Sequence, residues 1–182
     1  MKIMSTSLDN VYLIEEPVHK DNRGQFMETW NEMGYSAKNL INDLPVEWAV
    51  KDDGTMHSTY FVQDNLSVSH KGVFRGLHYQ TDIHGQAKLV RTLKGAVIDF
   101  VVDLREMSDT YGKFEYFELN DRNNLSLFIP PYFAHGFLSL ENDTIFTYKC
   151  GNYYNKNAEG SVVYSDPIIR HVEDNNRTIK DI

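Results

Sequence analysis

The chain has a single cysteine, Cys150, among 182 residues, so it cannot form an internal disulfide. We therefore expect a mostly reducing compartment, the cytoplasm. No apolar run approaches the roughly 20 residues that a membrane-spanning helix needs, and no membrane contact is expected. The N-terminal MKIMSTSLDN also lacks the apolar segment of a signal peptide.

Positive charge is scarce. The chain has 18 Lys and Arg residues against 26 Asp and Glu residues, which gives a net charge of −8. Binding to nucleic acid needs a basic face that neutralises phosphates, so a general nucleic-acid binder is disfavoured. An anionic small molecule can still bind where a few Arg and Lys side chains gather in a cleft.

Strand-forming patterns are abundant. A hydrophobic content of 41% and an aromatic content of 13% are typical of a folded globular protein, and the length suits one domain spanning 1–182. Helical character is confined to 31–44. Strands are predicted within 11–19, 24–30, 58–69, 72–80, 113–120 and 143–154.

Two longer segments each divide into two strands. Segment 87–105 divides at Lys94-Gly95, a pair that favours a tight hairpin. Segment 125–141 divides at Pro130-Pro131, which should end a strand or form a corner. Many short strands with frequent turns predict a closed all-β barrel or jelly roll.

Seven histidines raise the question of a metal site, but their spacing gives it little support. A metal-binding barrel of this kind places two histidines one residue apart on a strand. Here Gln80 stands two residues after His78, no His-x-His occurs, and His84 lies in a loop-like segment. A Gly-x-Ser-x-Gly elbow and phosphate-binding glycine loops are also missing.

Acid–base chemistry remains. His78 and His135 lie in apolar, strand-like surroundings, where a lone histidine is more often a core residue than a catalyst. Tyr148 is compatible with an ordinary strand aromatic, and Lys88 with a surface lysine whose stem covers apolar neighbours. Arg75 is harder to explain as structure, because a buried guanidinium needs an anionic partner.

The stretch FRGLHYQ (74–80) carries a further constraint. In a regular strand Arg75 and His78 point to opposite faces. If both line one cavity, the strand must contain a local irregularity, and Gly76 marks a candidate bulge.

Several motifs together resemble one family, that of dTDP-4-dehydrorhamnose 3,5-epimerase. They occur in the family's order and cover most of the chain: DNRGQFMETWN (21–31), FVQDNLS (61–67), VFRGLHYQ (73–80), KLVRTLKGAVIDFVVDLR (88–105), IPPYFAHGF (129–137), YKCGNYY (148–154) and EGSVVYSDP (159–167).

The resemblance implies a cupin-type jelly-roll β-barrel with one or two short helices, a homodimer, and epimerisation without metal or cofactor. The implied substrate is a nucleotide-diphosphate 4-keto-6-deoxy sugar. By position, His78 resembles the catalytic base, Tyr148 the catalytic acid and Asp181 the carboxylate that pairs with the base. Lys88 and His135 match residues of the sugar site, and Tyr154 an aromatic near the nucleotide. The family's further substrate-contacting positions correspond in this sequence to Arg23, Glu28, Gln63, Asn65, Arg75, Glu159 and Lys180.

These roles are chemically coherent. A ketone at C4 acidifies the hydrogens on C3 and C5, so a base can remove either one to give an enolate. Inversion then needs a proton from the opposite face of the ring. Histidine suits the base because its ordinary pKa of about 6.5 lies near working pH. A lysine can stabilise charge on O4, and arginines suit the diphosphate.

Two segments depart from the family pattern. The segment 42–60 is longer than the family's route into FVQDN, and the approach to Lys180-Asp181 is shorter and lacks a tryptophan. If Asp181 is not the partner of His78, the alternatives are Asp99, Asp103 and Asp166.

Alternatives to the main hypothesis remain at this point. A GDP-linked 4-keto-6-deoxy-heptose competes with the dTDP hexose as substrate, and inversion can involve C3, C5 or both. A metal-dependent cupin oxygenase and a non-catalytic sugar-binding cupin are the rival classes of function.

Overall fold

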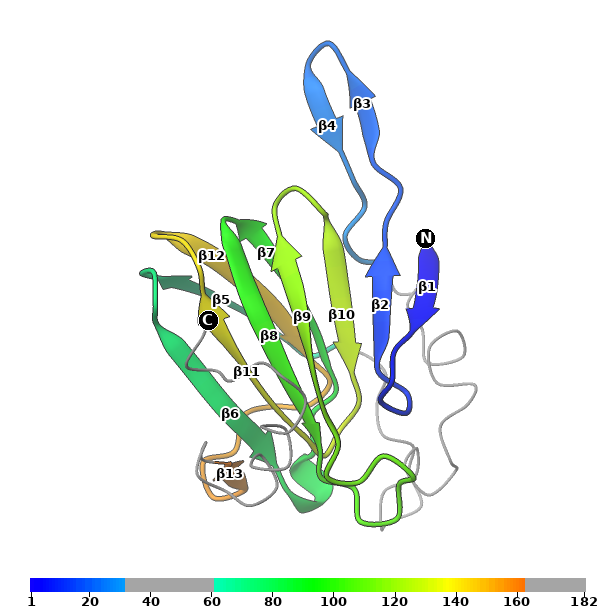
Figure 1. The fold of residues 1–182 in the computed structure, drawn as a ribbon, viewed down its shortest axis with the longest axis vertical. Helices are drawn as coiled ribbons and strands as arrows, with labels where there is room; N and C mark the ends of the chain where they lie inside the picture. Colours follow the sequence, from blue (N-terminus) through cyan, green and yellow to red (C-terminus); the bar gives the residue numbers. More distant parts are fainter. Residues whose placement is uncertain (32–60, 163–182) are drawn as a thin grey trace, which may run out of the picture.

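The computed structural model describes residues 1–31 and 61–162. In this part the chain forms two antiparallel sheets that pack face to face and a separate two-stranded hairpin (Figure 1). The described part contains one short 3₁₀ helix, η1 (Asp82–His84), and no helix in it is long and apolar enough to cross a membrane. Apart from Asn31, the predicted helix over 31–44 lies outside the described residues.

The six-stranded sheet has the order β1-β2-β10-β7-β12-β5. Its strands, in that order, span Lys2–Ser5, Tyr12–Glu15, Leu125–Ile129, Lys88–Lys94, Thr144–Cys150 and Gln63–Ser69. The five-stranded sheet has the order β13-β6-β11-β8-β9. Its strands span Glu159–Ser161, Phe74–Gln80, Phe133–Ser139, Ala96–Asp103 and Phe114–Asn120. The small hairpin pairs β3 (His19–Asp21) with β4 (Gly24–Phe26).

The predicted break at Lys94-Gly95 is confirmed, but the predicted hairpin is wrong. β7 pairs with β10 and β12, whereas β8 pairs with β9 and β11 in the other sheet. Gly95 alone separates the two strands, and its φ of +80° is one that glycine adopts without a Cβ clash. The turn is therefore a corner between sheets. Pro130-Pro131 form the predicted corner, because β10 and β11 also lie in different sheets.

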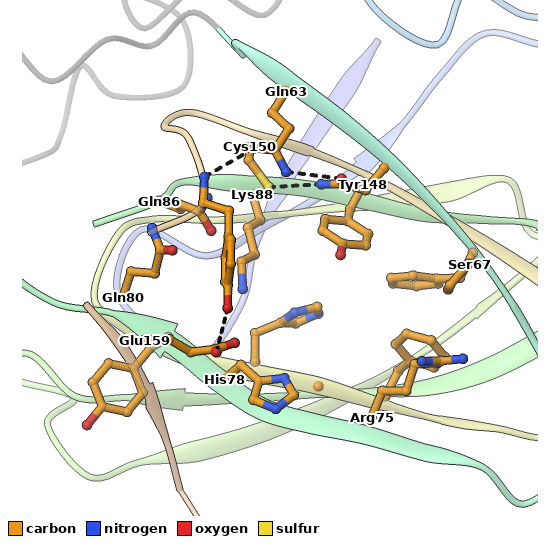
Figure 2. A pocket seen from close by; sticks show the side chains of 17 residues that line it. Gln63, Ser67, Arg75, His78, Gln80, Gln86, Lys88, Tyr148, Cys150 and Glu159 are labelled. Carbon is orange, nitrogen blue, oxygen red and sulfur yellow. Dashed lines mark hydrogen bonds between the residues drawn. The ribbon is translucent and has the colours of Figure 1, made fainter. Parts of the chain in front are cut away.

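An apolar core fills part of the space between the sheets. Val90, Val97 and Leu127, from β7, β8 and β10, are completely buried there. Beside them the rings of Phe137 and Phe146 lie 4.2 Å apart between centroids. The same two rings border a polar cavity (Figure 2), so the interior is divided between an apolar core and a site lined by polar groups.

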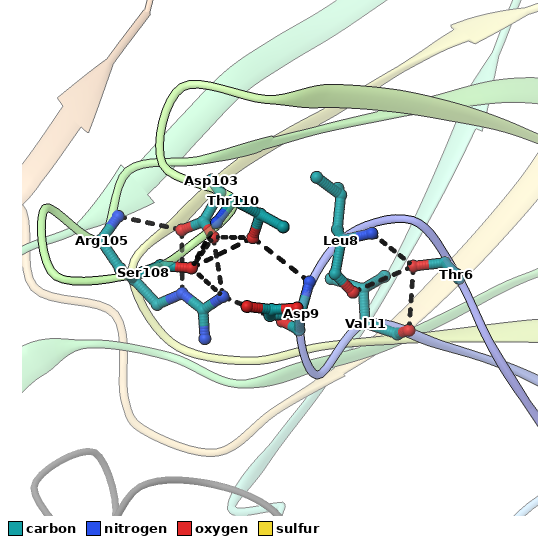
Figure 3. Close-up of polar contacts among 8 residues, drawn as sticks. All are labelled: Thr6, Leu8, Asp9, Val11, Asp103, Arg105, Ser108 and Thr110. Carbon is teal, nitrogen blue, oxygen red and sulfur yellow. Dashed lines mark hydrogen bonds and ion pairs between the residues drawn. The ribbon is translucent and has the colours of Figure 1, made fainter.

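A buried ion pair ties the loop after β8 to the N-terminal turn (Figure 3). The Arg105 side chain is 2% exposed and its Nη2 donates to Asp103 Oδ2 at 2.7 Å. The same nitrogen donates to the Asp9 carbonyl at 2.9 Å. Ser108 and Thr110 also donate their hydroxyls to Asp103. Burial alone would raise the pKa of Asp103, but these hydrogen bonds outweigh it and hold the pKa below its usual value.

Replacing Asp103 should therefore destabilise the protein strongly. In Asp103→Asn the buried Arg105 guanidinium loses its charged partner, and we expect the free energy of unfolding to fall by about 3–5 kcal/mol at neutral pH. The difference from wild type should shrink as the pH falls below about 4, the ordinary value for Asp, through the lower folded pKa. Denaturant unfolding across this pH range measures both effects.

Arg122→Ala is the control, because the Arg122–Glu141 pair is exposed at 72% and 48%. Its loss should cost less than about 1 kcal/mol. Equal, small losses in the two variants would contradict a stabilising role for the Asp103 network.

Candidate active site

Two glycines let the backbones of the neighbouring strands β6 and β11 approach each other closely. A Cβ added at Gly76 would lie 2.5 Å from the Cα of Gly136, and one added at Gly136 would lie 2.5 Å from the Arg75 carbonyl oxygen. Gly76 also has a φ of +128°, which disfavours any other residue. Only glycine fits both positions without a shift of the backbone.

The pairing register of β6 and β11 shifts at this close approach. His78 pairs with His135 and Arg75 pairs with Phe137, so three steps along β6 face two steps along β11. The irregularity predicted at Gly76 is therefore present, and it turns Arg75 and His78 into the same cavity. The sequence interpretation of Arg75 as buried is wrong, because its side chain is exposed to the cavity and donates Nε to Ser69 Oγ at 3.0 Å.

The cavity has a volume of about 550 Å³ and lies between the two sheets (Figure 2). Strands β5, β7 and β12 supply one wall, and β6, β11 and β13 the other. Most of the residues singled out from the sequence line it: Gln63, Asn65, Arg75, His78, Lys88, His135, Tyr148, Tyr154 and Glu159.

His78 and Tyr148 reach the cavity from opposite sheets (Figure 2). His78 stands on β6 and is exposed to the cavity, whereas Tyr148 stands on β12 and is half-buried. Burial and the nearby Cys150 raise the pKa of Tyr148, and Arg75 opposes them in part. The phenol therefore keeps its proton at neutral pH.

Lys88 projects from β7 into the cavity that these two groups line (Figure 2). Burial lowers the pKa of its ammonium group, while Cys150, Asp99 and Glu159 act in the opposite direction. A cation held among groups of negative charge and low polarity can stabilise an oxyanion that forms beside it.

His135 is fixed by a buried carboxylate. Its Nε2 lies 2.9 Å from Asp99 Oδ2, and both side chains are almost completely buried. Burial raises the pKa of Asp99, opposed by His135 and by Lys88. Asp99 therefore pairs with His135, which removes it as an alternative partner of His78.

The partner of His78 is not found among the described residues. No hydrogen bond to its ring occurs within 1–31 and 61–162. Asp103 is excluded as an alternative because it is committed to Arg105. Lys180, Asp181 and the alternative Asp166 lie outside the described residues.

Arg23 and Glu28 do not line the cavity of their own chain. Arg23 lies on the β3–β4 hairpin, which projects beyond the end of the sandwich (Figure 1). Its side chain is 85% exposed and pairs with Asp21 at 2.6 Å. The structure therefore separates these two residues from the other candidates.

The cavity also contains residues that were not singled out as candidates: Ser67, Gln80, Gln86 and Cys150. Two of them follow from strand alternation, since Ser67 continues the inward row of Gln63 and Asn65, and Cys150 continues that of Tyr148. Asn65 Nδ2 donates to the Cys150 sulfur at 3.6 Å. No group of three or more His, Cys, Asp or Glu side chains suited to a metal ion occurs in the described part of the chain.

Relatives cover nearly the whole chain. A family model described as dTDP-4-dehydrorhamnose 3,5-epimerase matches residues 5–173. The dTDP-4-dehydrorhamnose 3,5-epimerase of Methanothermobacter thermautotrophicus is 42% identical over 168 residues, which cover 92% of this chain and 81% of that protein.

Solved structures agree with this assignment. The dTDP-4-dehydrorhamnose 3,5-epimerase of Elizabethkingia anophelis is 43% identical with a TM-score of 0.79, covering 93% of this chain and 84% of that one. The dTDP-6-deoxy-D-glucose-3,5-epimerase of Legionella pneumophila, solved with dTDP-4-keto-L-rhamnose, is 38% identical with a TM-score of 0.78, covering 92% and 80%. The predicted all-β, cupin-type fold is confirmed.

The close approach of β6 and β11 at the two glycines can be tested by substitution. Gly136→Ala should force β6 away from β11, because the new Cβ meets the Arg75 carbonyl oxygen and Gly76 Cα within 2.8 Å. We expect a loss of about 1–3 kcal/mol in the free energy of unfolding. Backbone amides of β6 should also exchange faster with deuterium, as measured by mass spectrometry.

Gly112→Ala is the matched control. Gly112 has a φ of +73° but nothing within 4 Å of an added Cβ, so alanine there adds backbone strain without a clash. Unchanged deuterium exchange of the β6 amides in Gly136→Ala would overturn the interpretation that β6 and β11 need glycine at this point of close approach.

Proposed function

The chain belongs to the dTDP-4-dehydrorhamnose 3,5-epimerase family, and we propose that it inverts C3 and C5 of a dTDP-linked 4-keto-6-deoxy sugar through an enolate. The observation that carries this proposal is the opposed placement of His78 on β6 and Tyr148 on β12. Inversion requires a base on one face of the sugar ring and an acid on the other, and the two sheets supply them.

Each inversion is a balanced proton exchange. His78 removes the proton from the carbon beside the ketone, and the electron pair moves to O4 as an enolate. Tyr148 then donates its proton to the opposite face of the same carbon, and solvent restores both side chains to their starting states. The raised pKa of Tyr148 keeps that proton available.

Three further residues bind and stabilise the substrate in this proposal. Lys88 stabilises the developing charge on O4, since its ammonium group points into the cavity that His78 and Tyr148 also line. His135, oriented by Asp99, hydrogen-bonds the sugar. Arg75 meets the diphosphate, for which its planar set of donors is suited.

The relatives support the dTDP-linked substrate. The Legionella enzyme was solved with a dTDP-linked 4-keto sugar, and none of the matched proteins described above supports the GDP-linked heptose. Inversion at both carbons is the activity in the names of these relatives. We extend it to this chain together with the single-domain organisation of residues 1–182.

We also propose that the protein acts as a homodimer. Arg23 and Glu28 are assigned to substrate binding by resemblance, yet they do not line the cavity of their own chain. A projecting hairpin with an exposed Arg23 and a 68% exposed Phe26 suits contact with a second protomer. In a dimer this hairpin can deliver Arg23 to the partner's cavity.

The assignment of base and acid is tested by isotope exchange. In D₂O with a dTDP-linked 4-keto-6-deoxy sugar, the wild type should place deuterium at C3 and C5, followed by NMR. His78→Ala should lose exchange and turnover by about 10²–10⁴-fold, because the base is missing. Tyr148→Phe should still exchange but form less inverted product, because only the acid is missing.

The controls separate the rival functions. A GDP-linked 4-keto heptose, tested in parallel, decides the nucleotide and the sugar. Full activity in His78→Ala would refute the base assignment. Absence of exchange in a wild type that binds the sugar would favour the non-catalytic module, and turnover that depends on a stoichiometric transition metal would favour the oxygenase.

The opposite pKa shifts at Lys88 and Tyr148 predict the alkaline limb of the pH profile. Lys88 has a lowered pKa, so its cationic form is lost as the pH rises through a value below its usual 10.5. The raised pKa of Tyr148 places its ionisation above 10.0. We expect kcat/KM to fall with Lys88, and Lys88→Arg to move the residual limb to higher pH.

Cys150→Ser is the control for this profile, because the thiol lies near Lys88 and also titrates in the alkaline range. Its limb should persist and move to lower pH, because the variant removes the Cys150 contribution that raises the pKa of Lys88. A limb that disappears in Cys150→Ser and stays unmoved in Lys88→Arg would contradict the assignment to Lys88.

A further inference from the structure

The loop between β12 and β13 carries Tyr154 to the rim of the cavity without support from a sheet. Residues 151–152 form bends, 153–155 have no regular structure, and 156–158 form a turn. Loops of this kind are usually the mobile part of a site. Something other than a strand ladder must therefore hold Tyr154 in place.

Side-chain amides provide that support, and Gln80 contributes most of it. Its Nε2 donates to the Tyr153 carbonyl at 3.2 Å and to the His84 carbonyl at 2.7 Å, and its Oε1 accepts from the Asn155 N–H at 2.7 Å. Two carbonyls on one side and an N–H on the other fix the orientation of the amide. Both N–H groups of Gln80 are thus used within the protein.

Tyr154 lies between the two residues that Gln80 holds. Its own N–H donates to Gln63 Oε1 at 3.2 Å, and its hydroxyl donates to Glu159 Oε2 at 3.0 Å. Glu159 is also the register partner of Gln80 across β13 and β6. Gln80 is 5% exposed, and its side chain joins the strand of His78 to the residues on either side of Tyr154. The Tyr154 hydroxyl extends this connection to Glu159.

We infer that Gln80 is a positioning residue that sets nucleotide-sugar affinity by holding Tyr154 and Glu159 at the cavity rim. The inference rests on the proposed function, since it assigns Tyr154 and Glu159 to substrate binding. Gln80 does not act on the reacting carbons. Its donors are occupied by backbone carbonyls, and no hydrogen bond of its side chain reaches His78, Lys88 or Tyr148.

The test compares Gln80→Glu and Gln80→Met with wild type. Glutamate keeps the shape and one acceptor but loses both donated hydrogen bonds, whereas methionine loses all three without adding charge. We expect the Kd for dTDP, by titration calorimetry, and the KM for the dTDP-linked sugar to rise at least about tenfold. The kcat at saturation should change by less than about threefold, because the base, the acid and Lys88 keep their positions.

A double-mutant cycle with Tyr154→Ala tests the route of the effect. If Gln80 acts through this loop, Gln80→Met should change the Kd much less in the Tyr154→Ala background than in wild type. Asn120→Asp is the matched control. It alters another buried amide that holds a turn, at the opposite edge of the five-stranded sheet, through bonds to the N–H groups of Arg122 and Asn123. It should leave the Kd and KM unchanged.

The outcomes distinguish the inference from the function on which it rests. A wild type that neither binds dTDP nor exchanges deuterium refutes the proposed function. With an active wild type, unchanged Kd and KM in Gln80→Met overturn the inference. A fall in kcat at unchanged Kd, or full additivity with Tyr154→Ala, also overturns it.

Discussion

The close backbone approach of β6 and β11 at Gly76 and Gly136 is the constraint on which the site depends. Without a Cβ on either residue, the backbones approach to a distance that no other pair of residues allows. The register shift that accompanies this close approach turns both Arg75 and His78 into the cavity. A regular strand would send one of them to the outer face of the sheet. The steric demands of two glycines thus decide which side chains can meet a substrate.

Burial between the sheets shifts the pKa values of groups that line the cavity. The same loss of water raises the pKa of a phenol and lowers that of an ammonium group, because each neutral form is favoured. Tyr148 therefore holds its proton more tightly and Lys88 less tightly than in water. An acid that stays protonated suits the final step of an inversion. The cost to Lys88 is limited by Asp99 and Glu159, whose charges act in the opposite direction.

Much of this arrangement could be predicted from residue patterns, and the exceptions have physical causes. Strand-forming patterns identified the segments, because period two is a local property. Tyr148 was assigned to the site through the family resemblance. Assignment of β7 and β8 to different sheets was missed, since a single-glycine corner and a tight hairpin look alike in sequence. The pairing of Asp99 with His135 depends on the register of β8 and β11, which the sequence does not encode locally. The projection of the Arg23 hairpin away from its own cavity likewise depends on the assembled fold.

The division between scaffold and rim has a consequence for substrate choice. Strand positions hold the proposed base and acid by ladder hydrogen bonds on both sides, so the backbones of His78 and Tyr148 are fixed by the sheets themselves. Tyr154 lies instead on a loop that is held by the side-chain amides of Gln63 and Gln80. Glu159 lies on a short edge strand that pairs with β6, and it accepts a hydrogen bond from the Tyr154 hydroxyl. Under the role inferred for Gln80, a change of this amide alters the affinity for the nucleotide without moving His78 or Tyr148. Under the proposed function, the reacting groups and the nucleotide contacts are positioned by different sets of interactions, which meet at β6, where His78 and Gln80 stand two residues apart.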